Sequence, residues 1–386
     1  MRRVCAAALA VLIASAVLTA GGCAVGEGFD GLPDGSTADE AGVSIHMAIT
    51  NALKGGVDQT QTSLGLARFK TQADILGVDL LLDLGDLYYG NPFATMTGGE
   101  SLADVIREVG YDAMLCGWSD WGYGVEKLRA LERRSMVPVL ASNVVSAETG
   151  EAFFGTPFII RDIDGVRVGI FGVIDQALNR WTSKAVYEQV RFRDPVLAAQ
   201  RAVSELAERG CQVIICMSSV SCAELIARSV PGLDAVLAGG EDWTGLDYGE
   251  DDVLRDVPII TAQTGLEDFA SLELTMDPER LHVERVETRW YSAADYADIV
   301  PDPAVDSAIA SRMTVLTPLF GEILNVTPVT LRAMDPMDPY AEAELPRLVT
   351  DAYREKTGAD AAFTFAAATL KDIPAGSITY GQLIEL

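Results

Sequence analysis

Four short turns carry most of the side chains that could do chemistry. They read DLGDLYYG (83–90), CGWSDWGYG (116–124), CMSSVS (216–221) and AGGEDWTG (238–245), and each follows an apolar stretch typical of a buried strand. Open α/β sheets place their ligand sites at the carboxyl ends of the strands. We therefore expect these turns to present their side chains along one rim of the fold.

The turns offer carboxylates and indole rings. Carboxylate oxygens suit hard cations such as Ca²⁺ or Mg²⁺, whereas aromatic faces beside carboxylates suit sugars or cationic ligands. A third interpretation is structural: the indoles fill the cleft and the carboxylates form a solvated edge. The carboxylates are Asp86, Asp120, Glu241 and Asp242, and the indoles are Trp118, Trp121 and Trp243.

The elements that position these turns alternate between strand and helix. A hairpin is expected at 158–173, with Asp164-Gly165 as its two-residue turn. Strands are predicted at 43–49, 78–85, 111–116, 137–142, 211–218 and 233–240, and helices at 101–110, 124–135 and 194–210. After about residue 295 the pattern changes to long helices at 302–324 and 343–358, followed by a strand at 359–365. The order predicts an α/β fold with two domains.

The chain of 386 residues has a formal net charge of −27. Such a charge repels nucleic acid and anionic membrane surfaces, so neither is an expected partner. Beyond Cys23, the cysteines are not spaced as a CxxC metal pattern. Buried thiols are expected, with a disulfide among the last three as the alternative. These cysteines are Cys116, Cys211, Cys216 and Cys222.

The first 23 residues have the three parts of a secretory signal: two arginines, an apolar run and small residues before Cys23. This pattern predicts an exported lipoprotein, at the cell surface or in the periplasm, anchored through Cys23. A secreted soluble protein is the alternative. Membrane contact would then be made only through the lipid. Residues 24–42 are rich in Gly and Asp and are expected to form a flexible tether.

The order and spacing of the turns resemble the 5′-nucleotidase family of calcineurin-like metallophosphatases. LLLDLGDLYYG (80–90), GYDAMLCGWSDWGYG (110–124), VPVLASNV (137–144) and VPGLDAVLAGGEDWTG (230–245) align with blocks of that family. The resemblance implies a two-sheet metallophosphatase sandwich flanked by helices at 43–295. It also implies a partial α+β 5′-nucleotidase C-terminal domain at 296–386. The Asn143 amide is expected to hydrogen-bond loop backbone.

Members of the family hold two divalent metal ions, which polarise the phosphoryl group and supply a hydroxide nucleophile. Carried over residue by residue, the family's bridging Asp is present as Asp86, the one ligand retained. The family's catalytic His is replaced by Ser119, so no catalytic residue is intact. The other former metal positions are Ile49, Asn51, Trp118, Ser219, Glu241 and Trp243, and an Asp that supports the catalytic His falls on Gly122.

The small number of histidines agrees with this alignment. The chain contains two histidines, His46 and His282, whereas a dinuclear site of borderline metals needs several imidazoles together. The family's N-G-G-G-I-R segment is FAAATL (365–370) in this chain, without its Asn and Arg. By resemblance, the sequence covers about half of the family's C-terminal domain. This partial domain is expected to pack against a partner or to be mobile.

These observations favour a catalytically inactive, exported homologue of the family with no metal cofactor. One alternative is a ligand-binding module that uses a cleft lined by Trp118, Asp120, Trp121, Asp242 and Trp243. Another is a rebuilt site for Ca²⁺ or Mg²⁺ on the oxygen ligands Asp86, Asp120, Glu241 and Asp242. A further alternative is residual metal-dependent hydrolysis of nucleotide phosphoesters. The sequence does not identify the partner, whether small molecule or protein.

Overall fold

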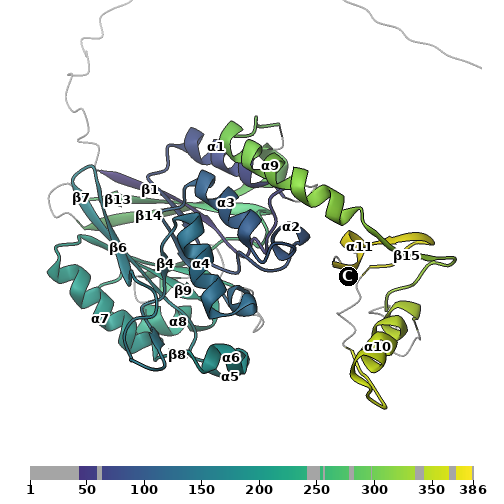
Figure 1. Cartoon of the computed structure of the whole chain (residues 1–386). Helices are drawn as coiled ribbons and strands as arrows, with labels where there is room; N and C mark the ends of the chain where they lie inside the picture. Colours follow the sequence, from purple (N-terminus) through teal and green to yellow (C-terminus); the bar gives the residue numbers. More distant parts are fainter. Residues whose placement is uncertain are drawn as a thin grey trace, which may run out of the picture. The chain divides into compact units, whose positions relative to one another are not determined.

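Two six-stranded sheets form the centre of the fold, shown in the computed structural model of Figure 1. The structure describes residues 43–58, 63–240, 253–254, 257–277, 282–296, 298–334, 343–364 and 371–384. The first sheet has the order β14-β13-β1-β2-β3-β4, and its four strands β1 to β4 are parallel. Their bounds are β1 Ser44–Thr50, β2 Leu80–Asp83, β3 Ala113–Leu115, β4 Val139–Leu140, β13 Asp268–Met276 and β14 Val283–Ser292.

The second sheet has the order β11-β12-β10-β9-β7-β6. Its strands β7, β9, β10 and β12 are parallel, and β6 forms the predicted hairpin with β7. Asp164 and Gly165 both have positive φ, as a two-residue hairpin turn requires. The bounds are β6 Phe158–Ile163, β7 Val166–Val173, β9 Val213–Ser219, β10 Ala235–Gly239, β11 Val253–Leu254 and β12 Val257–Thr261. A small separate sheet pairs β5 Val144–Ser146 with β8 Val190–Phe192.

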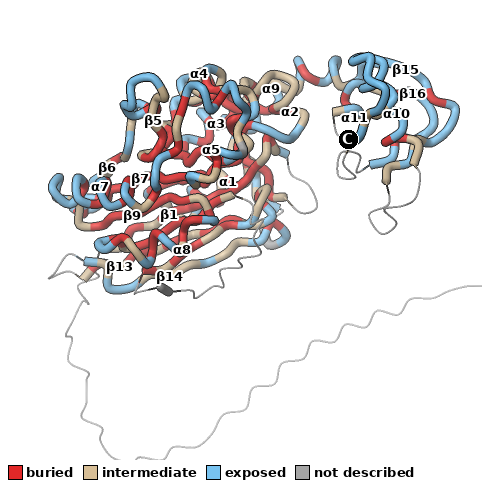
Figure 2. The backbone as a smooth tube through the Cα atoms, turned by 90° about the horizontal axis from the view of Figure 1, so that it is seen from below, coloured by how far each residue is buried: buried red, intermediate tan, exposed pale blue. Residues whose placement is uncertain are grey.

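The two sheets share one apolar core. Buried residues of β1, β2 and β13 belong to the same cluster as inward residues of β7, β9 and β10. The other face of the second sheet packs in a second cluster against α7 (Pro195–Glu208) and α8 (Val220–Ser229). Figure 2 shows the buried residues gathered along the strands. The predicted two-sheet sandwich flanked by helices is therefore confirmed.

Helices begin where the sequence supplies caps. Asp194 accepts hydrogen bonds from two backbone N–H groups of the first turn of α7, and Asp302 does the same for α9 (Pro303–Phe320). The remaining helices of four or more residues include α1 Leu66–Leu76, α2 Pro92–Thr95, α3 Glu100–Val109, α4 Val125–Ser135, α5 Leu178–Trp181 and α6 Lys184–Tyr187. Two 3₁₀ helices, η1 Ser119–Tyr123 and η2 Ala293–Tyr296, complete this part.

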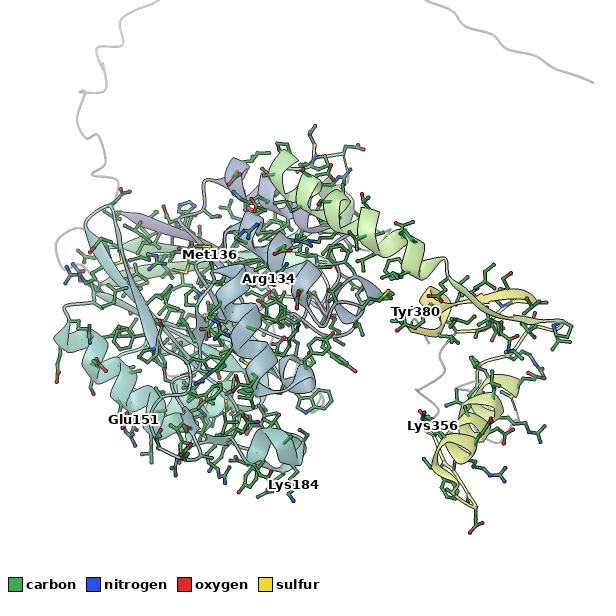
Figure 3. The ribbon with its side chains drawn as sticks, in the orientation of Figure 1. Arg134, Met136, Glu151, Lys184, Lys356 and Tyr380 are labelled. Atoms are coloured by element: carbon green, nitrogen blue, oxygen red, sulfur yellow. The ribbon has the colours of Figure 1, made fainter. Side chains whose placement is uncertain are left out.

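An ion-pair cluster joins α9 to α3 and α4. Asp104 of α3 accepts from Arg134 of α4 at 2.7 Å, and Arg312 of α9 contacts the same carboxylate. Arg134 is labelled on α4 in Figure 3. The pKa of Asp104 is lowered because hydrogen bonding and charge from the two arginines outweigh its burial. Arg107, Arg312 and small residues of α9 line a hollow of about 370 Å³ beside this cluster.

The C-terminal elements have a small core of their own. The strands β15 (Ile323–Thr327) and β16 (Gly376–Thr379) pair antiparallel, and α10 (Glu344–Thr357) and α11 (Tyr380–Ile384) accompany them. Two predictions here are wrong in part. The helix predicted at 302–324 ends at Phe320 and gives way to β15, because Gly321 favours a break. Residues 359–364, the described part of the strand predicted at 359–365, form no strand, since Ala and Asp, which make up four of the six, are depleted in strands.

Candidate functional site

The carboxyl ends of the parallel strands of both sheets meet at one edge of the sandwich, as the sequence predicted. A Cβ atom on Gly239, at the end of β10, would lie 2.3 Å from Leu84, which follows β2. A Cβ atom on Gly172 of β7 would lie 2.1 Å from the Leu140 carbonyl oxygen of β4. Only glycine permits these approaches, so the turns after the strands lie in direct contact.

The Asp120 carboxylate binds the turns after β2 and β3 together. Its Oδ1 accepts from the backbone N–H groups of Leu87 and Tyr88, and its Oδ2 from those of Asp86 and Gly117, all at 2.9 Å. The side chain is fully buried. Four donors offset much of the cost of burying a carboxylate, so we assign Asp120 a structural role.

Asp83, the last residue of β2, is a second fully buried carboxyl group. Asp83 accepts from the Thr50 hydroxyl at 2.7 Å and from the Gly85 N–H at 3.0 Å, and Thr50 also contacts the Tyr111 hydroxyl. Burial raises the pKa of Asp83 to about 8, against the lowering effect of these hydrogen bonds. Burial, and after it the negative charge of the neighbouring Asp86, also raises the pKa of Asp120 above its ordinary value, against the lowering effect of its backbone hydrogen bonds.

Asp86, predicted by resemblance as a metal ligand, is held by the turn after β3. Its backbone has a φ of 56°, a left-handed conformation that is uncommon for a residue with a side chain. Its Oδ1 accepts from the Ser119 backbone N–H at 2.7 Å and from the Ser119 hydroxyl at 2.8 Å. Ser119, predicted to replace a catalytic histidine, therefore donates two hydrogen bonds to the Asp86 carboxylate.

Asn51, predicted by resemblance as a former metal position, joins the two sheets. Its Nδ2 donates to the carbonyl oxygens of Gly240 at 3.3 Å and Ala262 at 3.0 Å, and its Oδ1 accepts from the Gly240 N–H at 2.9 Å. The side chain is buried. All of its polar groups thus serve the backbone of the second sheet.

Asn143 makes the matching link after β4. Its amide donates to the carbonyl oxygens of Ile174 and Arg193 and accepts from the Ile174 N–H. The prediction that Asn143 hydrogen-bonds loop backbone is confirmed. Of the remaining former metal positions, Ile49 is fully buried in β1, and the Ser219 hydroxyl accepts from the Asp175 N–H at 3.2 Å.

The two described indoles of the turn after β3 lie in opposite environments. Trp118 is 56% exposed, whereas Trp121 is 4% exposed and packs edge-on against Phe192, with ring centroids 5.2 Å apart. The expected cleft lining is corrected here: Trp121 and Asp120 are enclosed by protein and offer no surface to a ligand. Trp118 does not fill a cavity either, because most of its surface meets solvent.

Several predicted positions lie outside the described residues. These are Cys23, Glu241, Asp242, Trp243 and the segment 365–370. Within the described chain, no group of three or more His, Cys, Asp or Glu residues is arranged to hold a metal ion. His46 lies near Glu273 of β13, at 3.5 Å. The cysteines Cys116, Cys211, Cys216 and Cys222 are free thiols, so the disulfide alternative is not found.

The sequence reasoning missed Tyr89, which is 43% exposed and contacts Tyr123 with ring centroids 5.2 Å apart. It lies in the same turn as Asp86, and a Cβ atom on Gly122 would lie 2.9 Å from its ring. The pair of tyrosines in DLYYG was the available signal.

Curated relatives of the chain include nucleotidases. A 5′-nucleotidase of Diplobatis ommata is 26% identical over 318 residues, covering 76% of this chain and 54% of the relative. A 2′,3′-cyclic-nucleotide 2′-phosphodiesterase/3′-nucleotidase of Haemophilus influenzae is 24% identical over 188 residues, 42% of this chain and 28% of the relative. The chain thus spans about half or less of the length of these relatives. No family model matches it.

Solved structures share the fold. A 5′-nucleotidase precursor of Thermus thermophilus superposes with a TM-score of 0.66 at 19% identity, over 89% of this chain and 73% of that one. The NAD nucleotidase of Haemophilus influenzae gives a TM-score of 0.63 at 18% identity, over 89% and 74%. These matches confirm the predicted α/β architecture.

We expect Asp120→Asn to destabilise the fold by about 3 kcal/mol, because an amide nitrogen would face backbone N–H donors where an oxygen now accepts. The measurement is the urea midpoint of unfolding. Asp164→Asn is the control, since it makes the same change in an exposed hairpin turn. A midpoint for Asp120→Asn equal to that of the control would contradict the structural role of Asp120.

Asp83 predicts a dependence of stability on pH. The folded pKa of Asp83 of about 8 lies above its ordinary value of 3.8, so the stabilising contribution of Asp83 is full below pH 3.8 and is lost as pH rises through about 8. We expect a higher urea midpoint at about pH 5 than at about pH 8, and a smaller difference in Asp83→Asn. Asp164→Asn should retain the full difference. An equal pH dependence in both variants would contradict the assignment.

Proposed function

This chain is related to the 5′-nucleotidase family of calcineurin-like metallophosphatases, and we propose that it is an exported, non-catalytic relative. Its proposed domains are a metallophosphatase-like part at 43–295 and a C-terminal part at 296–386. The turns that serve chemistry in the family would here serve structure and ligand contact.

The observation that carries the proposal is the bond between Ser119 and Asp86. The family uses a histidine at this position, and a serine hydroxyl is a very poor general acid near neutral pH. Here both donors of Ser119 engage Asp86. The Asn51 side chain hydrogen-bonds backbone of the second sheet. Neither Asn51 nor Ser119 has the imidazole group that a borderline metal prefers.

Export is supported by the sequence of residues 1–23, which lies outside the described residues. In the part of the chain that the structure describes, no helix is long and apolar enough to cross a membrane. We propose that Cys23 carries the lipid that holds the protein at the membrane surface.

A binding function is a second candidate, and the exposure of Trp118 favours it. An indole 56% exposed at the edge where both sheets end is a ready contact for a small molecule. This function is compatible with loss of catalysis, since ligand contact needs neither metal ion nor general acid.

The first experiment measures metal content and hydrolysis together. Protein purified without chelator should contain no stoichiometric transition metal, and it should hydrolyse neither a nucleoside monophosphate nor a cyclic nucleotide with added Mn²⁺, Zn²⁺, Mg²⁺ or Ca²⁺. Asp86→Ala should behave identically. Metal-dependent turnover that disappears in Asp86→Ala would restore the enzyme as the correct interpretation.

The anchor is tested in a bacterial host by fractionation and labelling with a radioactive fatty acid. The full chain should enter the membrane fraction and carry label, whereas Cys23→Ala should do neither, because the thiol is the lipid attachment site. Cys5→Ala is the control, because it removes another cysteine of the same segment. Label retained in Cys23→Ala would overturn the assignment.

A further inference from the structure

The hollow of about 370 Å³ beside the ion-pair cluster lies between α3 and α9, which pack against each other (Figure 1). All residues that line it belong to the described chain, and none belongs to the turns after the strands. Besides two alanines of α9, the lining consists of Asp104, Arg107, Glu108, Ser307, Ser311 and Arg312. The hollow is therefore a polar site separate from the one described above.

The ion-pair cluster at this hollow has more positive than negative charge. Arg134 binds both oxygens of Asp104, through Nε at 2.7 Å and Nη2 at 2.8 Å, which is the bidentate geometry that best satisfies a carboxylate. Arg134 and Lys127 also pair with Glu100, and Arg312 contacts the carboxylate that Arg134 already binds. Three cations thus face two carboxylates, so the charge of Arg312 is the one that the cluster does not balance.

The second guanidinium group of the hollow is weakly held. Arg107 donates to Glu108 through Nε at 3.2 Å and through Nη2 at 3.1 Å, and both side chains are exposed. Exposed ion pairs of this kind contribute little to stability, because water screens them and two long side chains must be ordered. Arg107 can therefore exchange this contact for a ligand at small cost.

Two hydroxyl groups of α9 complete the lining. Ser307 and Ser311 are four positions apart, so they lie on the same side of the helix. Thr314 and Thr317 of the same helix donate to backbone carbonyl oxygens one turn earlier. Neither serine hydroxyl has a hydrogen-bond partner among the described residues. Both can therefore donate to a group bound in the hollow.

These donors select the charge of the ligand. Guanidinium and hydroxyl groups complement the oxygens of a carboxylate or a phosphate, and arginine can bind either in a bidentate manner. A metal ion would find the carboxylates of the hollow already bound to arginines. The net charge of −27 opposes an anion at long range. The Debye length is about 8 Å at physiological ionic strength, so charges next to the hollow decide the outcome.

We propose that this hollow binds a small oxyanion, a carboxylate or a phosphate, between the guanidinium groups of Arg107 and Arg312 and the hydroxyls of Ser307 and Ser311. A bound anion would bridge α3 and α9, and α9 is the helix that leads into β15. The proposal goes beyond the proposed function and is independent of it, because the two share no residue.

The test is calorimetric titration of the full chain with inorganic phosphate and, separately, with succinate, at an ionic strength held constant with chloride. We expect saturable binding of at least one anion at one site, and the tighter anion identifies the preferred group. Arg107→Gln, and Ser311→Leu, which fills the hollow, should each weaken binding about tenfold or more. Arg228→Gln is the matched control, because Arg228 is also an exposed helical arginine paired with a nearby glutamate, and it should bind as the unmodified chain does.

Two results would overturn the oxyanion site. One is that neither anion gives more heat than chloride does. The other is binding that is equally tight in Arg107→Gln and Arg228→Gln, since such an anion would lie elsewhere. If Ser311→Leu fails to fold by circular dichroism, Arg107→Gln decides alone, because its side chain is exposed. Both results leave the loss of catalysis standing, since the assay of metal content and hydrolysis measures it separately.

Discussion

The fold of the site depends on one carboxylate that accepts four backbone hydrogen bonds. Asp120 satisfies the N–H groups of Gly117, Asp86, Leu87 and Tyr88 at once. Without it, the turns after β2 and β3 would leave buried donors unpaired, each at a cost of about 1–3 kcal/mol. This constraint also holds Asp86 in its left-handed conformation and fixes the backbone from which Trp118 projects.

Two asparagines extend the same principle to the contact between the sheets. Asn51 connects the end of β1 to the turn after β10, and Asn143 connects the end of β4 to the end of β7. Each asparagine side chain supplies a donor and an acceptor to backbone groups that lie beyond the paired residues of the strands. The strand ends are thus joined by uncharged amides, a solution that needs no metal ion.

The side chains at the positions predicted as metal ligands serve the backbone of the turns or one another. Asn51 hydrogen-bonds the backbone of the second sheet, and Ser119 donates to the Asp86 carboxylate through its backbone N–H and its hydroxyl. Amide and hydroxyl groups satisfy neighbouring donors and acceptors, but neither is the imidazole that borderline metals prefer. These contacts support the proposed loss of catalysis.

The sequence by itself predicted the alternation of strands and helices and the hairpin at Asp164-Gly165, because apolar periodicity and turn residues are local properties. The two-sheet sandwich was predicted from the resemblance to a known family, and the convergence of the turns from the rule that ligand sites lie at the carboxyl ends of parallel strands. The sequence also predicted the scarcity of imidazole, which is a matter of composition. The tertiary structure alone decided the environment of each turn residue. Trp118 and Trp121 are three positions apart in one turn, yet one is exposed and the other is packed against Phe192. Asp86 and Asp120 have the same chemistry, but Asp120 accepts from four backbone N–H groups whereas Asp86 accepts from the backbone N–H and hydroxyl of Ser119, since burial and hydrogen bonding depend on contacts between distant segments.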